Sequence, residues 1–494
     1  MSEPIDRNQE FSEQEAIRRA KLQQLVDRGE SPYLQTSFDQ THYSQDIKEA
    51  ITRLEGQTVH IAGRMMTRRI MGKASFAHLL DGQGRIQVYV KRDDIGEEAY
   101  AAFKDYDLGD ILGVKGYAFV TRTGEVSVHA RSIVLLSKCL KPLPDKWHGL
   151  QDVDLRYRQR YLDMIVSPEV RDTFVRRTAI INAIRRFADS RGFLEVDTPI
   201  LHTLEIGAAA RPFKTHHNTL DIDMFLRVET ELYLKRLVVG GFERVYEIGR
   251  IFRNEGMSPK HNPEFTSIEM YQAYADYEDI MNLCEDLIRE TAREAVGGER
   301  ITFQGQQVDF SSPWPRIPMA EAVKRESGID YFAWNSDEEA RQCLKDHGVH
   351  AEPHFTRGDC LAELFDAYVE AKLIQPTFIT DYPVEISPLA KRKPSDPRLT
   401  ERFELFIVGA EFANGFSELN DPIDQRERFV RQVEERRKLG GVNASVDEDY
   451  LNALEYGLPP TGGIGIGVDR LVMLLTDNAS IRDVLLFPTM KPQG

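Results

Sequence analysis

The chain contains few cysteines and no long apolar segment. Its four cysteines, at positions 139, 284, 343 and 360, are scattered along 494 residues and form no Cys-x-x-Cys pair. Such spacing suggests neither a disulfide framework nor a zinc site, so a reducing cytosol is the simplest compartment. No apolar run approaches the length of a membrane span, and the polar start of the chain lacks a signal-peptide core. We therefore expect a cytoplasmic protein that does not enter a membrane.

Positive charge is also in deficit. The chain has 63 Lys and Arg residues against 79 Asp and Glu residues, which gives a formal net charge of −16. This balance by itself argues against a nucleic-acid-binding protein. The charge is uneven, however, because residues 57–80 contain no acid and four cations, Arg64, Arg68, Arg69 and Lys73. An acidic protein with one basic region remains compatible with RNA binding at that region.

Two common nucleotide-binding signatures are missing as well. The chain has no Gly-Lys-Ser or Gly-Lys-Thr sequence, which disfavours a P-loop ATPase. The glycine-rich run 463–467 lacks the Gly-x-Gly-x-x-Gly form and the βαβ pattern of a dinucleotide-binding turn. Any nucleotide chemistry in this protein must therefore use another arrangement.

Residues 243–271 are the feature around which the rest of the chain is organised. Apolar and polar residues alternate over 245–252 and again over 265–271, as in half-buried strands. The intervening loop is rich in Gly, Pro and Asn and carries Arg253 and His261. The Arg253 guanidinium is a planar fork of donors that fits a carboxylate or a phosphate. The pattern predicts an antiparallel strand–loop–strand unit with anion-binding cations, and the alternative is a surface hairpin with a solvated loop.

The part of the chain before this unit predicts a small barrel. Residues 12–28 have the spacing of a basic amphipathic helix, which either contacts RNA or only packs on the next domain. Five short alternating runs then lie between residues 59 and 136, with a helical stretch at 93–106 between the third and fourth. This order matches the Greek-key barrel that binds oligonucleotides. The proline-bearing segment 141–147 reads as a linker.

The part after the barrel predicts a second, larger domain. A long amphipathic helix is expected at 167–190, followed by an extended segment at 192–201. Residues 402–419 read as two alternating strands that place Glu404 and Glu411 across from one another. A glycine-rich strand and a helix are expected at 463–475. The fold class is therefore α+β.

Three stretches together resemble the class II aminoacyl-tRNA synthetases, and within them the lysyl-tRNA synthetases. Residues 192–199 (GFLEVDTP) are similar to the first motif of that family, with its proline. The sequence from Phe252 to Glu255, with His261 and Phe265, is similar to the second motif, and 463–470 (GIGIGVDR) to the third. Each motif alone is weak, but three in order at compatible spacing are strong. The resemblance extends from about residue 10 to the C-terminus.

The resemblance implies an architecture and an assembly. We expect a helical extension at 1–55, an anticodon-binding OB-fold barrel at 56–140 and a linker at 141–165. A catalytic domain with an antiparallel sheet flanked by helices is expected at 166–494, with an insertion at about 285–375. The family forms homodimers through the helix and strand of the first motif. An ordinary core helix and strand is the alternative for that segment.

The resemblance also implies a reaction with ATP. Activating a carboxylic acid with ATP brings two anions together, so the site must supply cations that touch both. Arg253 would bridge the amino-acid carboxylate and the α-phosphate, and Arg470 would hold the γ-phosphate; these two are the expected catalytic residues. Glu404 and Glu411 would bind Mg²⁺, which prefers oxygen ligands. The expected ATP-binding set is Arg253, Glu255, His261, Asn262, Phe265, Glu404, Glu411 and Arg470.

The expected amino-acid pocket is acidic and contains no cation. The resemblance places Glu418, Glu269 and Tyr271 at the ε-ammonium of lysine. It places Glu231 and the backbone of Gly207 at the α-ammonium, and Asn414 beside the carboxylate. Related aspartate enzymes carry a lysine where this chain has Leu234. The full lysine-binding set is Gly207, Glu231, Arg253, Glu269, Tyr271, Asn414 and Glu418, and the alternative is that some of these acids only pair with Arg227 or Arg236.

The expected partners are L-lysine, ATP and tRNA(Lys). Lysine would be activated to lysyl-adenylate with release of pyrophosphate, and then transferred to the 3′ end of the tRNA. The resemblance places Arg68, Phe76, Gln87 and Glu125 at the anticodon, although a strand phenylalanine is more often a core residue. A non-catalytic RNA-binding relative is the competing hypothesis. It is disfavoured because Arg253, Arg470 and the acidic metal ligands are all present.

Overall fold

The structure is a computed structural model that describes residues 12–144, 150, 152–205, 210–438 and 445–493. The chain divides into two compact units, Met1–Leu150 and Gln151–Gly494, which are described separately. Within the described ranges, no helix has both the length and the apolar character needed to cross a membrane.

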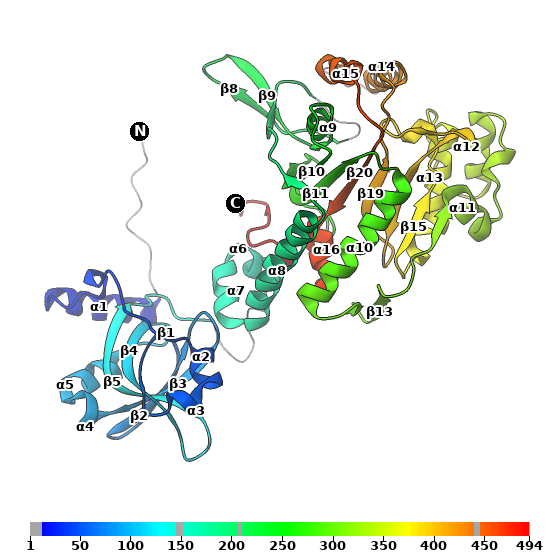
Figure 1. Ribbon diagram of the computed structural model, residues 1–494. Helices are drawn as coiled ribbons and strands as arrows, with labels where there is room; N and C mark the ends of the chain where they lie inside the picture. Colours follow the sequence, from blue (N-terminus) through cyan, green and yellow to red (C-terminus); the bar gives the residue numbers. More distant parts are fainter. Residues whose placement is uncertain (1–11, 145–149, 151, 206–209, 439–444, 494) are drawn as a thin grey trace. The chain divides into compact units, whose positions relative to one another are not determined.

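The first unit is built on the predicted barrel (Figure 1). Five strands close in the order β1-β2-β3-β5-β4, and β3 pairs with β5 in parallel while the other pairs are antiparallel. The predicted helix between the third and fourth strands is present but broken at Gly96, whose φ of 93° is accessible to glycine without strain. The elements of this unit are α1 (Glu13–Asp27), η1 (Pro32–Leu34), α2 (Ser44–Glu49), α3 (Ile51–Leu54), β1 (Thr58–Met71), β2 (Ala74–Leu80), β3 (Arg85–Lys91), α4 (Arg92–Ile95), α5 (Glu97–Asp105), β4 (Ile111–Val120) and β5 (Val126–Ser137).

Helix α1 forms as predicted, but its amphipathic character was predicted wrongly. Ile17 is half exposed, whereas Arg18 is only 9% exposed. The Arg18 guanidinium donates hydrogen bonds to the backbone carbonyls of Leu108, Cys139 and Lys141 at 3.0–3.1 Å. The helix is thus attached to the barrel through a polar contact, in which one guanidinium nitrogen, with its two N–H groups, is shared among three backbone carbonyls.

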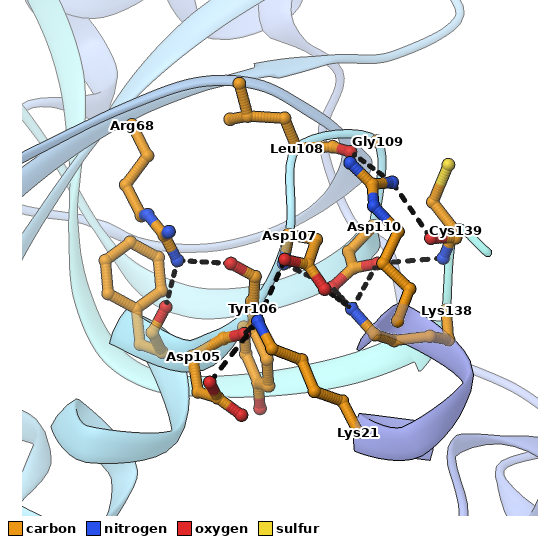
Figure 2. A network of polar contacts seen from close by, with 12 residues as sticks. Lys21, Arg68, Asp105, Tyr106, Asp107, Leu108, Gly109, Asp110, Lys138 and Cys139 are labelled. Atoms are coloured by element: carbon orange, nitrogen blue, oxygen red, sulfur yellow. Dashed lines mark hydrogen bonds and ion pairs between the residues drawn. The ribbon is translucent and has the colours of Figure 1, made fainter. Parts of the chain in front are cut away.

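A second polar contact lies beside the first (Figure 2). Lys21 on α1 lies 2.9 Å from an Asp107 carboxylate oxygen. Lys138, which is almost fully buried, lies 2.5 Å from Asp107 and 2.8 Å from Asp110. Asp110 also accepts a hydrogen bond from the backbone N–H of Cys139. The two lysines and two aspartates therefore join α1, the loop before β4 and the end of β5.

The second unit is built on an eight-stranded, mainly antiparallel sheet (Figure 1). Its strand order is β14-β15-β18-β19-β20-β11-β10-β6, so β19 and β20 are the two middle strands, β11 lies next to β20, and β6 lies at one edge. The strands of this sheet are β6 (Leu194–Glu195), β10 (Arg244–Phe252), β11 (Glu264–Ala273), β14 (Arg316–Pro318), β15 (Thr377–Thr380), β18 (Arg402–Phe406), β19 (Glu411–Ser417) and β20 (Thr461–Gly467). The predicted strand–loop–strand unit is β10 and β11, and their antiparallel pairing is confirmed.

Three helices form the core with one face of this sheet. α8 (Pro168–Ser190), α10 (Tyr277–Val296) and α16 (Val468–Leu475) contribute Ile184, Leu287 and Leu471 to one buried cluster with sheet residues such as Ile268 and Ile466. A separate cluster joins α9 (Glu231–Val239) and α15 (Glu448–Glu455) to the sheet. The sheet is therefore held by helices on both sides of the strands that carry the predicted motifs.

The remaining elements of this unit extend around the sheet. Two helices, α6 and α7, lie within the stretch 141–165 that was expected to be a linker. Helices α11, α12 and α13 lie within the expected insertion and share a buried cluster of their own. These elements are α6 (Val153–Arg158), α7 (Arg160–Val166), β7 (Leu201–His202), β8 (Lys214–His217), β9 (Ile222–Leu226), β12 (Arg300–Phe303), β13 (Gln306–Asp309), α11 (Met319–Ser327), η2 (Tyr331–Ala333), α12 (Asp337–Asp346), α13 (Arg357–Tyr368), η3 (Glu370–Lys372), η4 (Val384–Ile386), β16 (Arg392–Lys393), β17 (Asp396–Thr400), α14 (Pro422–Lys438) and α17 (Ile481–Val484).

Candidate active site

A cavity of about 370 Å³ opens over the centre of the eight-stranded sheet. It brings together most of the residues that the motifs predicted, from segments more than 200 residues apart. The predicted residues that line it are Glu231, Arg253, Glu255, His261, Asn262, Phe265, Glu269, Tyr271, Glu411, Asn414, Glu418 and Arg470. Gly207 lies outside the described residues, and Glu404 does not line the cavity.

Strand pairing explains how these side chains meet. Glu269 on β11 pairs with Gly465 on β20, which in turn pairs with Asn414 on β19. Residues directly opposite one another point to the same face of a sheet, so this row points into the cavity. The central strand contributes glycines here, which leaves room above it. A Cβ atom on Gly463 would lie 2.1 Å from the Glu418 carboxylate, so no larger residue fits without moving that side chain.

One end of the cavity is lined by cations. The Arg253 guanidinium lies over the Phe265 ring, 5.5 Å from its centroid, and no carboxylate among the described residues is within ion-pair distance of it. Arg470 donates to the backbone carbonyl of Glu411 and to Nε2 of His261, the latter at 3.3 Å. Burial and the neighbouring Arg470 lower the pKa of His261 below its usual value, so the imidazole is neutral at pH 7. This end is suited to an anion such as a polyphosphate.

The sequence analysis placed the two predicted metal ligands, Glu404 and Glu411, directly opposite one another, and the structure does not. Glu404 pairs with Asn414, whereas Glu411 pairs with Phe406 after an irregularity in the β18–β19 ladder. A direct Glu404–Glu411 pair would need the turn between the two strands to lie closer to β18, but Glu404 pairs with Asn414, so the turn lies further along the chain than the sequence pattern suggested. The two carboxylates are close enough to interact electrostatically: burial is the main cause of the raised pKa of Glu404, and the charge of Glu411 contributes to it.

The carboxylate oxygens of the two glutamates differ in their hydrogen bonding and exposure. Glu404 accepts a hydrogen bond from the Tyr382 hydroxyl at 2.9 Å and from Arg402 at 2.6 Å. The Glu411 side chain is 45% exposed and lies 3.6 Å from Arg470. In the described part of the chain, no group of three or more His, Cys, Asp or Glu side chains is placed to hold a metal. The pair fits Mg²⁺ in the way this ion usually binds, with one or two carboxylates and the phosphates of a nucleotide.

The other end of the cavity is acidic, and a lysine that the sequence analysis missed lies behind its wall. Lys235 on α9 has no exposed side-chain surface, and its Nζ lies 2.5 Å from Oε1 of Glu231 and in contact with Oε2 of Glu418. The four-residue spacing from Glu231 was a usable signal, because side chains four apart on a helix are neighbours. Its contact with Glu418 joins segments 183 residues apart, which sequence spacing does not show.

The alternative that arginines neutralise the pocket acids is not what the structure shows. Arg227 pairs with Glu247 at 2.5 Å, and Arg236 pairs with Asp447 at 2.7 Å. A further acid, Glu229, lines the cavity and was missed in the sequence, where it precedes α9 without any motif.

The environment of the pocket acids favours their uncharged forms. Burial, with Glu231 as a neighbour, raises the pKa of Glu269 to about 7, although Glu269 accepts hydrogen bonds from the Thr230 N–H and the Tyr271 hydroxyl. Burial and the same neighbouring carboxylate raise the pKa of Glu229 to about 8. The pocket has more carboxyl groups than cations, and their pKa values are raised. A cationic ligand would lower these pKa values by stabilising the ionised carboxylates, so such a ligand fits this pocket.

A second cavity, of about 360 Å³, lies on the barrel and has an aromatic lining. Its walls include Phe76, Tyr89 and Phe119, and the rings of Phe76 and Tyr89 lie 5.1 Å apart. Phe76 is only partly buried, whereas the next residue, Ala77, belongs to the barrel core. The alternative that Phe76 is a core residue is therefore wrong.

Two predicted anticodon residues contact each other on the barrel, and a third lies elsewhere. Gln87 donates to the Glu125 carboxylate at 2.8 Å. Arg68, however, donates to the backbone carbonyls of Phe103 and Tyr106 (Figure 2). Arg68 pairs with Ala77 across the β1–β2 ladder, and the residue that pairs with Phe76 is Arg69. The role of Arg68 at the anticodon stays a prediction. Because side chains alternate between the two faces of a strand, the pairing of Phe76 with Arg69 places Arg69, and not Arg68, on the face of Phe76.

Comparisons with known proteins agree with this geometry. Residues 152–491 match the family of class II tRNA synthetases (D, K and N), and residues 59–136 match the OB-fold nucleic acid binding domain. The chain is 57% identical to the lysine–tRNA ligase of Pelotomaculum thermopropionicum over 494 residues, which cover 99% of this chain and 97% of that protein. It is 56% identical to the lysine–tRNA ligase of Moorella thermoacetica, over 97% of this chain and 98% of that protein.

A third relative, the lysine–tRNA ligase of Thermoanaerobacter pseudethanolicus, is 55% identical over 98% of this chain and 97% of its own length. The resemblance drawn from the three motifs is confirmed by these matches. The chain therefore belongs to the class II tRNA synthetase family of the D, K and N enzymes, and it is an aminoacyl-tRNA synthetase.

Proposed function

We propose that this protein is a lysine–tRNA ligase. It activates L-lysine with ATP to lysyl-adenylate and pyrophosphate, and then transfers lysine to the 3′ end of tRNA(Lys). The observation that carries the proposal is the cavity itself, which has cations at one end and four carboxylates at the other. The names of the similar proteins, all lysine–tRNA ligases, support it.

The acidic end of the cavity holds the substrate lysine in this proposal. Glu418 and Glu269, with the Tyr271 hydroxyl, bind the ε-ammonium. Glu231, together with the backbone at Gly207, binds the α-ammonium, and Asn414 lies beside the carboxylate. Burying an ammonium group without a counter-charge is costly, so carboxylates at this depth favour a substrate with a terminal cation.

The cationic end holds ATP. Arg253 bridges the substrate carboxylate and the α-phosphate, while Arg470 and the neutral His261 bind the outer phosphates. Phe265 stacks on adenine, with Glu255 and Asn262 near the nucleotide. Glu411, with Glu404 behind it, would hold Mg²⁺, which supplies further positive charge to the phosphates. No side chain acts as the nucleophile, because the substrate carboxylate attacks the α-phosphorus directly.

The barrel, residues 56–140, reads the anticodon in this proposal. Phe76 offers a stacking platform beside Tyr89, and Gln87 and Glu125 offer polar groups for base edges. Arg68 remains part of the proposed anticodon set, and Arg69 adds a cation beside Phe76, with which it pairs across the β1–β2 ladder.

The protein acts as a homodimer in the cytosol in this proposal. Val175 on α8, Leu194 on β6 and Leu201 on β7 are apolar and exposed, and β6 lies at the sheet edge. These elements correspond to the first motif and the helix before it. Exposed apolar side chains beside an unpaired strand edge are typical of a surface that a second subunit covers.

The test of the proposed function is ATP–pyrophosphate exchange measured without tRNA across the amino acids. Lysine should support exchange, whereas norleucine, which lacks the ε-ammonium, should be strongly rejected because the pocket acids would be left without a counter-charge. Exchange with aspartate or asparagine in preference to lysine would contradict the proposed substrate and leave the reaction class intact.

A further inference from the structure

Lys235 lies behind the wall of the amino-acid pocket and does not line the cavity itself. It is fully buried, contacts Glu231 and Glu418 through its ammonium group, and lies 5.4 Å from the centroid of the Phe416 ring. A buried ammonium is stable only with close counter-charges. Its place in the fold therefore depends on two acids that the substrate also needs.

The two shared carboxylates each have a second oxygen. Lys235 contacts Oε1 of Glu231 and Oε2 of Glu418. Both oxygens of Glu418 are buried, and neither accepts a hydrogen bond from a described residue, but Lys235 contacts Oε2 as an ion pair and Oε1 has no such cation partner among the described residues. A Cβ atom on Gly463, which also lines the cavity, would collide with this oxygen, so the glycine leaves the space next to it free. A carboxyl oxygen without a donor at this depth can accept a hydrogen bond from a ligand ammonium group.

We propose that Lys235 is a positioning residue for lysine recognition: it holds one oxygen of Glu231 and one of Glu418, so that the remaining oxygen of Glu418 is presented to the substrate ammonium. The inference rests on the proposed function and adds a residue to it. Lys235 acts through the two acids and does not touch the substrate.

The electrostatics around Lys235 give the physical reason. The charged and titratable groups that face it are Glu231 on α9, Glu418 after β19, Glu269 and Tyr271 on β11, Tyr450 on α15, and Glu229 before α9. Burial lowers the pKa of Lys235, but Glu231 and Glu418 more than compensate and raise it. Burial raises the pKa of Glu418, and Lys235 opposes that effect.

Removing this cation leaves several carboxylates close together without a counter-charge. Like charges at such distances favour the uptake of a proton by one of them. A protonated Glu418 is a weak partner for an ammonium ion, so lysine would have to displace that proton in order to bind. The loss should therefore be largest at low pH and should diminish as the pH rises.

The test compares Lys235→Met with the wild-type enzyme in lysine-dependent pyrophosphate exchange between pH 6 and 8.5. We expect the KM for lysine to rise about 10–100-fold at pH 6.5, the range for a lost interaction with a charged group, and the ratio of variant to wild-type KM to fall toward pH 8.5. The KM for ATP should stay within about twofold, since the change lies at the other end of the cavity. Lys324→Met, at an exposed lysine on α11 that pairs with Asp330, is the matched control and should leave both KM values unchanged.

A second variant distinguishes the loss of the charge from a folding defect. Lys235→Gln keeps two N–H donors but no charge, and it should show the same pH-dependent ratio. Wild-type behaviour of Lys235→Gln, a ratio that does not change with pH, or equal changes in the KM for lysine and for ATP would each overturn the role of Lys235 while lysine remained the substrate. Wild-type enzyme without lysine-dependent exchange would instead remove the proposed function, and this role with it.

Discussion

At the scale of single residues, Arg253 connects the two chemical halves of the cavity. It lowers both the pKa of Glu229 at the acidic end and that of His261 at the phosphate end. No described carboxylate neutralises it, so its charge is available to a ligand. In adenylate formation the ligand is a pair of anions that repel each other, and a shared cation reduces that repulsion most in the transition state.

Arg253→Ala should therefore abolish lysine-dependent pyrophosphate exchange, with a loss of at least about 10²–10³-fold in kcat. Arg250→Ala is the matched control: it removes an exposed arginine from β10, three residues before Arg253, and should retain exchange. A folded Arg253→Ala enzyme with substantial exchange would contradict the assignment of this residue.

At the scale of elements, the strands follow from the sequence, and the contacts between distant segments do not. Alternation identified β10, β11 and the barrel strands, and three motifs identified the elements that surround the cavity. Arg68 and Arg69 occupy opposite faces of β1, and the register of the folded barrel shows that Arg69 is the residue opposite Phe76. Lys235 was missed because its second partner, Glu418, is distant in the chain and only the folded sheet brings the two together.

The barrel provides the prediction at this scale. Phe76→Ala should weaken tRNA charging by roughly 1–3 kcal/mol, the usual effect of losing one stacked base. Pyrophosphate exchange without tRNA should not change, because Phe76 belongs to a cavity on the barrel and adenylate forms on the sheet of the other unit. The two assays are measured on the same preparation, and an equal loss in both would mean that Phe76 acts through stability instead of tRNA binding.

At the scale of the whole molecule, the acidic pocket links stability to pH. Burial raises the pKa of Glu269 to about 7 and that of Glu229 to about 8, above the ordinary value of an unfolded glutamate. Between about pH 5 and pH 8 the folded protein therefore binds more protons at these groups than the unfolded chain does. Their contribution to the free energy of unfolding is favourable at low pH and is lost as the pH rises through the folded pKa values.

Lysine should reverse part of this loss, because its ammonium groups favour the ionised carboxylates. We expect a fixed concentration of lysine to raise the Tm more at pH 8 than at pH 6, as measured by thermal unfolding. At a given pH, ionisable groups outside the pocket contribute equally to the Tm with and without lysine, so their contribution cancels in the difference between the two Tm values. Norleucine is the matched ligand control, and an increment from lysine that is the same at both pH values would count against the raised pKa values.

The attachment of α1 has a consequence for the order in which the chain folds during synthesis. Arg18 leaves the ribosome early, but its acceptor carbonyl at Cys139 lies 121 residues further along the chain. A contact of such high sequence separation cannot form until the last barrel strand has been made. The Arg18 guanidinium therefore completes its set of three acceptors only after the last barrel strand has been made, whereas the Leu108 carbonyl and the Asp107 partner of Lys21 become available earlier.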